Sequence, residues 1–243
     1  MDKTMIVGIL TNNFSKLNHI TRKLKNAEFN LVHLKKIPRI DHEIDVIVTD
    51  KSIENCLTPH VIPGNLDILE LKIRCAYYQK NNLTIGIDPG GICGLVASSN
   101  NHPLFQKEFK SIVIMTEIII SIDNEIGLKN IKIGTGSPPT RNLIVSSLQN
   151  YKSKIQFIDE RRSGSGSHIE AAIRIASRIP ELKEPSEYSP KDGEIAWIQK
   201  QSRRLSKGLI TINKETANRI LLGEMSMEEA IKKYTESLVK TKL

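Results

Sequence analysis

Residues 84–98, which read TIGIDPGGICGLVAS, constrain the possible folds of this chain more than any other stretch. An apolar run ends on a single carboxylate at Asp88, then Pro89, Gly90 and Gly91 follow, and the chain becomes apolar again. Because Pro and Gly favour tight turns between apolar runs, the pattern predicts a strand, a tight turn and a returning strand. A carboxylate at such a turn suits a metal site or a phosphate-handling site. Alternatively, Asp88 only caps the turn by bonding to its own backbone.

The composition is that of a soluble globular protein with an excess of positive charge. Of the 243 residues, 39% are hydrophobic and 26% are charged, and the formal net charge is +8. The excess is spread along the chain: +3 in residues 1–80 (12 basic, 9 acidic), +3 in residues 81–180 (11 and 8) and +2 in residues 181–243 (12 and 10). It favours a polyanionic partner such as DNA or RNA, bound by folded parts of the chain rather than by a basic tail.

Cysteine usage and hydropathy predict a cytoplasmic protein that makes no contact with membranes. The three cysteines, Cys56, Cys75 and Cys93, are far apart and form no CxxC pair, which favours reduced thiols over a zinc site. No apolar run approaches the roughly 20 residues of a membrane span. The N-terminus carries no signal-peptide pattern.

Residues 1–80 are expected to form a small α/β domain. Alternation and helical spacing of apolar residues predict strands at 4–10, 30–34 and 45–49 and helices near 17–27 and 66–78. This order resembles half of a doubly wound sheet, without a phosphate-binding signature. Asp50 follows a strand, where such folds place ligands, although a strand-end cap is the simpler role. This domain could position the rest of the chain, form a dimer or recruit a partner.

Residues 81–180 are expected to form a second α/β domain with the element order βββαβαβα. Residues 84–98 supply two strands. The remaining elements are strands at 103–110, 130–134 and 154–158 and helices at 112–126, 141–151 and 168–179. The segment 112–126 is rich in β-branched isoleucine, so a strand is an alternative there.

Residues 181–243 are expected to form a Pro-rich linker and a helical segment, with helices at 192–207, 214–222 and 227–238. Ser226 and Glu229 fit a capping box, S-x-x-E. The first helix carries Lys200, Arg203 and Arg204, and this basic side could follow a nucleic-acid backbone while Trp197 stacks a base. An anchor against the core is the simpler role for Trp197.

Four segments resemble, in their order along the chain, the RuvC/YqgF group of the RNase H-like superfamily. They are GIDPGGICGLVASS, IKIGTGSPPTRN, FIDERRSGS and HIEAAIRIA. Proteins of that group have a DxG first strand, a glycine-bearing fourth strand, a D-E-R segment after the fifth strand and an acid before small residues in the last helix. The resemblance implies an RNase H-like mixed sheet in residues 81–180, between the small α/β domain and the helical C-terminal segment.

The resemblance also implies a metal-dependent nuclease acting on structured or branched DNA or RNA, of the Holliday junction resolvase kind. Asp88, Glu160, His168 and Glu170 are the implied catalytic residues and the ligands of Mg²⁺ or Mn²⁺. Carboxylates are hard oxygen ligands that suit Mg²⁺, and two divalent cations can activate water and stabilise charge on the phosphate. His168 stands near the position where the group has its final acid. From the sequence, His168 and Glu170 are equally good candidates for this place in the site. Two copies could pair as a homodimer to cut two strands.

Phosphate contacts are expected at two helix starts. Arg161 and Arg162, with the loop SGSGS, precede the last helix of the second domain, where backbone N–H groups and the helix dipole can hold an anion. Residues 134–137 before the helix of Arg141 could act in the same way. A surface loop with solvated charges is the alternative. Asp159 is either a further ligand or the residue that orients Arg161.

Two other functions fit the sequence. The RuvC branch has a glutamate at the end of its fourth strand, where this chain has glycines, so a catalytically inactive nucleic-acid-binding protein of the same fold is one alternative. The other is an actin/sugar-kinase-like ATPase, because the GIDPGG turn also resembles the first phosphate loop of that superfamily. No second glycine-rich phosphate segment follows at the expected distance.

Overall fold

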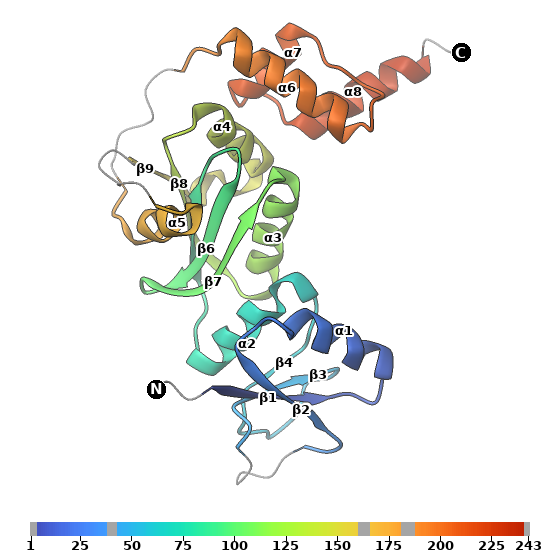
Figure 1. The fold of residues 1–243 in the computed structure, drawn as a ribbon, viewed down its shortest axis with the longest axis vertical. Helices are drawn as coiled ribbons and strands as arrows, with labels where there is room; N and C mark the ends of the chain where they lie inside the picture. The colour runs from blue at the N-terminus through green and yellow to red at the C-terminus, as the bar shows by residue number, and fades with distance from the viewer. Residues whose placement is uncertain (1–3, 38–42, 160–165, 181–187, 241–243) are drawn as a thin grey trace. The chain divides into compact units, whose positions relative to one another are not determined.

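The computed structural model describes residues 4–37, 43–159, 166–180 and 188–240, with side chains to residue 236. It is a mixed α/β protein with two sheets and a helical C-terminal part (Figure 1). Its contacts form two compact units. Unit 1 is Met1–Leu83 with Ser98–Phe105 and Ile118–Lys129, and unit 2 is Thr84–Ala97, Gln106–Glu117 and Asn130–Leu243. Leu83 lies close to the predicted boundary, but unit 1 also takes in ends of strands and of a helix from the second sheet region.

The first sheet has four parallel strands in the order β2-β1-β3-β4. These are β1 (Met5–Leu10), β2 (Phe29–Leu34), β3 (Val46–Thr49) and β4 (His60–Val61). The helices are α1 (Phe14–Leu24) and α2 (Leu69–Tyr78), the latter preceded by a 3₁₀ turn, η1 (Leu66–Ile68). Val7 opposes both Leu31 and Val46 in register. The predicted α/β unit is confirmed, whereas the two-residue β4 is too short to leave a periodic signal.

Helices α1 and α2 cover one face of the first sheet (Figure 1). Alternate residues of β1 and β3, such as Val7 and Val46, point to that face because side chains of a strand alternate between faces. Ile20 of α1 and Ile73 of α2 complete this core and are nearly or completely buried. Asn13 caps the start of α1, accepting a hydrogen bond from the Lys16 backbone N–H at 3.1 Å.

The second sheet has five strands in the order β7-β6-β5-β8-β9. They are β5 (Leu83–Asp88), β6 (Cys93–Ser99), β7 (His102–Phe109), β8 (Leu128–Gly134) and β9 (Ile155–Ile158), and β8 and β9 run parallel. The helical elements are α3 (Ile112–Glu125), α4 (Pro138–Ser147), η2 (Gln149–Lys154) and α5 (His168–Ser177). The order βββαβαβα is therefore present, and the isoleucine-rich segment is a helix.

The helix predicted at residues 141–151 was misplaced. α4 starts three residues earlier, with Pro138 and Pro139 in its first turn. Proline suits these positions because their N–H groups have no partner inside the helix and the ring already sets a helical φ. The helix ends at Ser147, and the rest of the predicted segment is the 3₁₀ turn η2.

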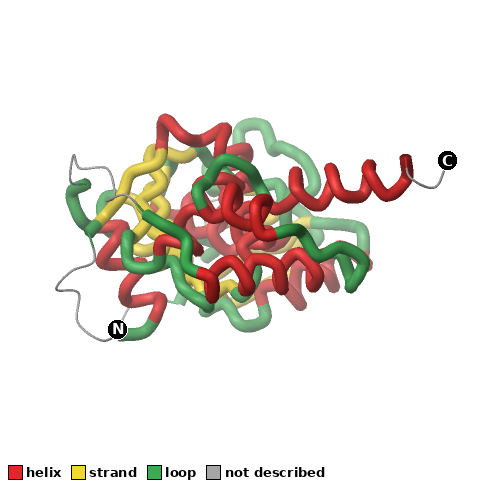
Figure 2. Tube along the Cα trace, turned by 90° about the horizontal axis from the view of Figure 1, so that it is seen from above, coloured by secondary structure: helices red, strands yellow, loops and turns green. Residues whose placement is uncertain are grey.

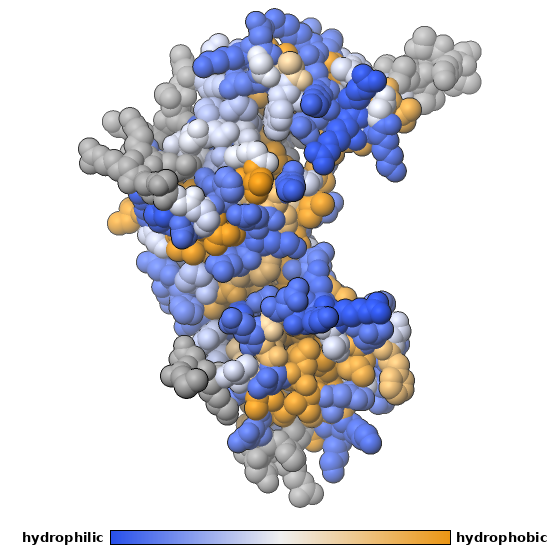
Figure 3. Space-filling view, viewed as in Figure 1, coloured by the Kyte–Doolittle hydropathy of each residue, from blue (hydrophilic) through white to orange (hydrophobic). Residues whose placement is uncertain are grey.

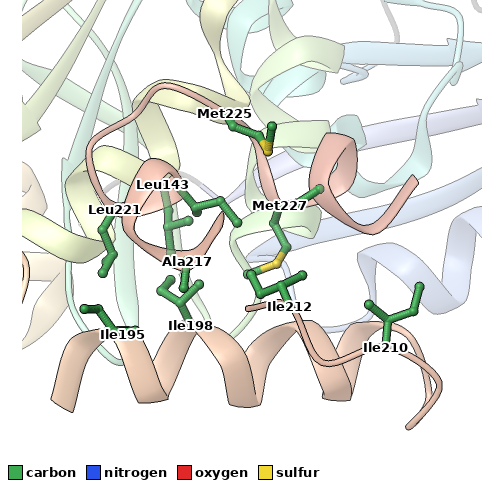
Figure 4. Packing of buried hydrophobic residues seen from close by; sticks show 11 residues of the cluster. Leu143, Ile195, Ile198, Ile210, Ile212, Ala217, Leu221, Met225 and Met227 are labelled. Carbon is green, nitrogen blue, oxygen red and sulfur yellow. The ribbon is translucent and has the colours of Figure 1, made fainter. Parts of the chain in front are cut away.

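The C-terminal part consists of α6 (Asp192–Leu205), α7 (Lys214–Leu221) and α8 (Met227–Lys240). The end of α8 extends past the other two helices (Figures 1 and 2). The predicted capping box is confirmed: Ser226 N–H donates to Glu229 Oε2 at 2.9 Å, and Glu229 N–H donates to Ser226 Oγ at 3.1 Å. The three helices share a core with α4, as Leu143 lies among Ile195, Ile198 and Leu221 (Figure 4).

None of the helices within the described ranges is long and apolar enough to cross a lipid bilayer.

Candidate functional site

Asp88 and His168 meet at the end of strand β5. His168 Nδ1 lies 2.9 Å from Asp88 Oδ2, although 80 positions separate the two residues in the chain. The carboxylate is largely buried, with 13% of its side chain exposed, whereas the imidazole is 43% exposed. The pair therefore has a fixed acid on the inside and an accessible ring on the outside.

Glycines in β5 and β6 let helix α5 come close enough to form this pair. A Cβ at Gly94 would collide with the backbone oxygen of His168, and a Cβ at Gly86 would collide with that of Ala172. The far end of the helix is held by Lys132 of β8, whose ammonium donates to Ala176 O at 2.7 Å and to Arg178 O at 2.6 Å. These cationic hydrogen bonds suit the negative end of the helix dipole.

The turn after Asp88 is held by a polar contact from α4. Thr140 Oγ1 lies 3.5 Å from Gly90 O and accepts a hydrogen bond from Ser137 Oγ at 3.2 Å. Thr140 is buried and was not predicted as part of the site. Its signal is the S-P-P-T sequence, which places the threonine one helical turn after the last residue of the loop.

Cys93 lies on the inner side of the same turn. Its Sγ is 3.6 Å from Gly90 O, and burial raises the pKa of the thiol above its ordinary value. A thiol with a raised pKa carries little thiolate at neutral pH, and the thiolate is the form that attacks or binds metal. Cys93 is therefore a packing residue here.

Glu170 points to the start of its own helix. Its Oε2 accepts a hydrogen bond from the Ser167 N–H at 3.1 Å, and its own N–H donates to Ser167 Oγ at 3.2 Å. This is a capping box, and S-H-I-E is the S-x-x-E pattern that also marks Ser226 and Glu229. Of the two candidates for the last position of the site, the structure thus places His168 at Asp88 and Glu170 at the helix N-terminus.

Three predicted site residues, Glu160, Arg161 and Arg162, lie outside the described residues. Asp159 just before them is half-buried, and its backbone oxygen accepts a hydrogen bond from Arg178 Nη1 at 2.6 Å. Within the described ranges, no group of three or more His, Cys, Asp or Glu side chains is arranged to hold a metal ion.

Arg141 is buried, with 5% of its surface exposed. Its guanidinium lies 5.8 Å from the centre of the Phe157 ring, its Nε donates to Asn142 Oδ1 at 3.2 Å, and burial lowers its pKa. Because α4 starts at Pro138, Arg141 falls on the inner side of the first turn instead of leading the helix. A guanidinium this buried has little surface to offer a phosphate, so we do not propose Arg141 as a nucleic-acid contact.

Lys200, Arg203 and Arg204 lie exposed on α6, as expected of a solvated basic side. On the face shown in Figure 3, the C-terminal helices carry mostly hydrophilic side chains. Trp197 is half-buried and packs against the hydrophobic core of the bundle, which is the anchoring role.

Asp50, at the end of β3 in unit 1, is engaged locally. Its carboxylate accepts hydrogen bonds from Thr11 Oγ1 at 2.5 Å and from Lys16 Nζ at 2.8 Å. The hydrogen bond from Lys16, followed by that from Thr11, lowers the pKa of Asp50. These contacts tie β3 to the start of α1 and fit the strand-end cap.

Comparison with known protein families matches residues 191–236 to the model of a three-helical bundle domain. The match spans α6, α7 and most of α8, which are 46 of the 243 residues, and it concerns only this part of the chain. A comparison with curated protein sequences finds no match.

Proposed function

We propose that this chain is a metal-dependent nuclease that cleaves phosphodiester bonds in structured or branched nucleic acid. The observation that carries the proposal is the 2.9 Å contact between Asp88 at the end of β5 and His168 at the start of α5. It joins the first and last of the four segments that resemble the RuvC/YqgF group. The net charge of +8 is consistent with a polyanionic substrate.

The arrangement of the second sheet supports an RNase H-like fold. Three consecutive strands, β5, β6 and β7, lie next to one another on one side of the sheet, and β8 and β9 extend it beyond β5. Both partners of the pair belong to elements packed at the central strand, because α5 rests on Gly86 of β5 and Gly94 of β6. A carboxylate there is held by the core and does not depend on a loop for its position.

The ligand atoms that Asp88 and His168 offer fit a divalent cation that keeps most of its water molecules. Asp88 Oδ1 makes no hydrogen bond with the described residues and is the oxygen that would take the ion. His168, whose Nδ1 faces Asp88 Oδ2, offers only Nε2, on the opposite edge of its ring, to a cation or a water. Mg²⁺ typically takes only one or two protein carboxylates, and the imidazole is a softer ligand that suits Mn²⁺ as well. When bound, such an ion would stabilise charge on the phosphate and lower the pKa of its water.

Asp88 and His168 can also divide the proton chemistry between them. If His168 Nδ1 carries the proton and its N–H donates a hydrogen bond to Asp88 Oδ2, then Nε2 is the nitrogen of the ring with a free lone pair. Because the ring is 43% exposed, Nε2 can take a proton from an attacking water or bind a cation. In that tautomer, the buried carboxylate would hold the orientation of the ring.

The test is Asp88→Asn, which keeps the size of the side chain and removes its charge. We expect cleavage of junction, flap and RNA substrates with Mg²⁺ or Mn²⁺ to fall at least about 100-fold, because the variant loses the charged oxygen ligand. Glu117→Gln, an exposed change on α3, is the control and should leave cleavage unchanged. A folded Asp88→Asn protein that cleaves at the wild-type rate would contradict the proposal.

A catalytically inactive nucleic-acid-binding protein is the second candidate. It is favoured by Glu170, whose carboxylate caps α5, since this leaves two donors at the described part of the site. Calorimetric titration with Mn²⁺ separates the two candidates. Saturable binding that Asp88→Asn removes supports the nuclease, whereas the absence of binding supports the inactive protein. For both candidates we place the protein in the cytoplasm, where its three widely spaced cysteines would stay reduced.

A further inference from the structure

Unit 2 contains a cavity of about 790 Å³ that adjoins the Asp88 turn. One wall is formed by α6 and the other by the segment that joins β7 to α3. Gly91 and Ile92, three and four positions after Asp88, are among its lining residues. Asp88 and His168 are not themselves among the lining residues, so an occupant of the cavity would meet the turn that follows Asp88.

The lining is positively charged. It includes the basic residues Lys107, Lys110 and Arg204 and a single acidic residue, Glu108, which gives a net charge of +2 (three minus one). All three basic side chains are exposed, and none of them forms an ion pair with another described residue. Lys200 and Arg203 continue the basic surface along α6. Lys107 Nζ lies 5.3 Å from the centre of the Phe109 ring, so it has an aromatic neighbour but no acidic one. Cations without acidic partners match a ligand that carries several negative charges.

Trp197 supplies an aromatic surface in the same cavity. It packs against the core of the bundle and is half-buried, so its position is held while part of the ring lines the cavity. A held aromatic ring in a cavity with cations that have no acidic partner is the combination by which proteins bind single strands: bases stack on the ring and the cations follow the phosphates.

We infer that this cavity binds a single-stranded segment of a nucleic acid, and, resting on the proposed function, that it leads that strand to Asp88. A cavity of 790 Å³ lies within the range of about 300–1,000 Å³ typical of ligand pockets. It accommodates a few unstacked nucleotides, whereas the bases of a duplex are stacked on one another and closed to Trp197. The preferred substrate class is then a flap or a branched molecule with a single-stranded arm.

Trp197 is the only tryptophan of the chain, so its fluorescence reports directly on the cavity. The probe is a 12-nucleotide oligothymidine added to the full chain in EDTA, with a blunt hairpin duplex, ATP and thymidine monophosphate as separate titrations. We expect the oligonucleotide to quench the fluorescence saturably and to bind at least tenfold more tightly than the duplex or either nucleotide. Trp197→Leu, which keeps apolar packing, should weaken oligonucleotide binding about tenfold when measured by anisotropy, through lost stacking.

The lysines provide an independent measurement. Each phosphate contact on a single strand contributes about 0.7 to the slope of log affinity against log salt. Lys107→Gln with Lys110→Gln should therefore reduce that slope by about 1.4. The matched control is Lys232→Gln with Lys233→Gln, two exposed lysines of α8 that do not line the cavity, and it should leave the slope within about 0.3 of wild type.

The inference is overturned if the oligonucleotide leaves the fluorescence unchanged, or if both lysine pairs change the slope equally. Tighter binding of ATP or thymidine monophosphate than of the oligonucleotide also overturns it and marks a nucleotide pocket. Because these titrations contain no metal, they do not depend on cleavage. A protein that binds the strand but never cleaves would contradict the proposed function alone, and one that cleaves while the cavity variants bind normally would contradict only this inference.

Discussion

Single glycines decide whether Asp88 and His168 can meet. Gly94 is needed because the backbone of His168 occupies the space where a Cβ would lie, whereas a Cβ at Gly91, three residues earlier, would meet nothing within 4 Å. Both belong to the same glycine-rich stretch, and the sequence alone does not distinguish their roles. Gly94 lies against α5, and this contact makes Gly94, but not Gly91, essential to the packing.

We expect Gly94→Ala to lower the free energy of unfolding by about 1–3 kcal/mol, because overpacking a tight contact forces the backbone to shift. If the chain has the nuclease activity proposed here, the change should also weaken cleavage by moving His168 away from Asp88. Urea unfolding and the nuclease assay measure the two effects. Gly91→Ala is the matched control and should stay within about 0.5 kcal/mol of wild type; equal effects of the two changes would contradict this account of the packing.

At the scale of the element, helix α5 carries two separate functions in its first turn. Ser167 and Glu170 satisfy backbone N–H groups at the start of the helix, and His168 between them reaches Asp88. Residues two apart on a helix point to different sides, so one turn can cap itself and contribute to a site. Lys132 then satisfies carbonyls at the other end.

Glu170→Gln separates capping from metal binding. Glutamine also completes a capping box, so we expect stability within about 0.5 kcal/mol of wild type and cleavage reduced less than threefold. Glu170→Ala should cost about 1 kcal/mol through the lost cap. Loss of cleavage in a stable Glu170→Gln protein would instead show that this carboxylate acts at the metal.

At the scale of the whole molecule, the C-terminal bundle and the second sheet region share part of one core within unit 2. Leu143 of α4 is 5% exposed and lies in the same apolar cluster as α6, α7 and α8. The Asn142 side-chain amide donates to the backbone oxygen of Leu221. The three-helical bundle that the family comparison matches is thus packed against α4, within the same unit as Asp88.

Leu143→Ala should destabilise this arrangement by about 2–5 kcal/mol, since it removes a buried side chain and leaves a cavity beside the bundle. Urea unfolding followed by Trp197 fluorescence detects the loss at the bundle. Leu209→Ala, at a side chain that is 82% exposed, is the control and should change stability by less than about 0.5 kcal/mol. If the two variants unfolded alike, Leu143 would not be part of the shared core.

The sequence by itself determined the order and type of most elements. Apolar spacing identified the strands of both sheets apart from the two-residue β4, and it identified the helices, although the bounds of α4 were misplaced. S-x-x-E located the capping box of α8, because such features depend on residues a few positions apart. The capping box of α5 has the same S-x-x-E pattern at Ser167 and Glu170, although the resemblance implied a metal-ligand role for Glu170. Asp88 and His168 were candidates through the resemblance.

Only the tertiary structure decided which side chains face one another. Arg141 is buried because α4 starts at Pro138 and turns that residue inward, and His168 rather than Glu170 reaches Asp88 because α5 lies on Gly94. The cavity between α6 and the end of β7 likewise joins residues from about 100 positions apart. Local patterns hold no information about such contacts, since the packing of distant elements sets the orientation of each helix. Residues 84–98 therefore contain the acid, Asp88, and the fold brings its partner, His168, next to it.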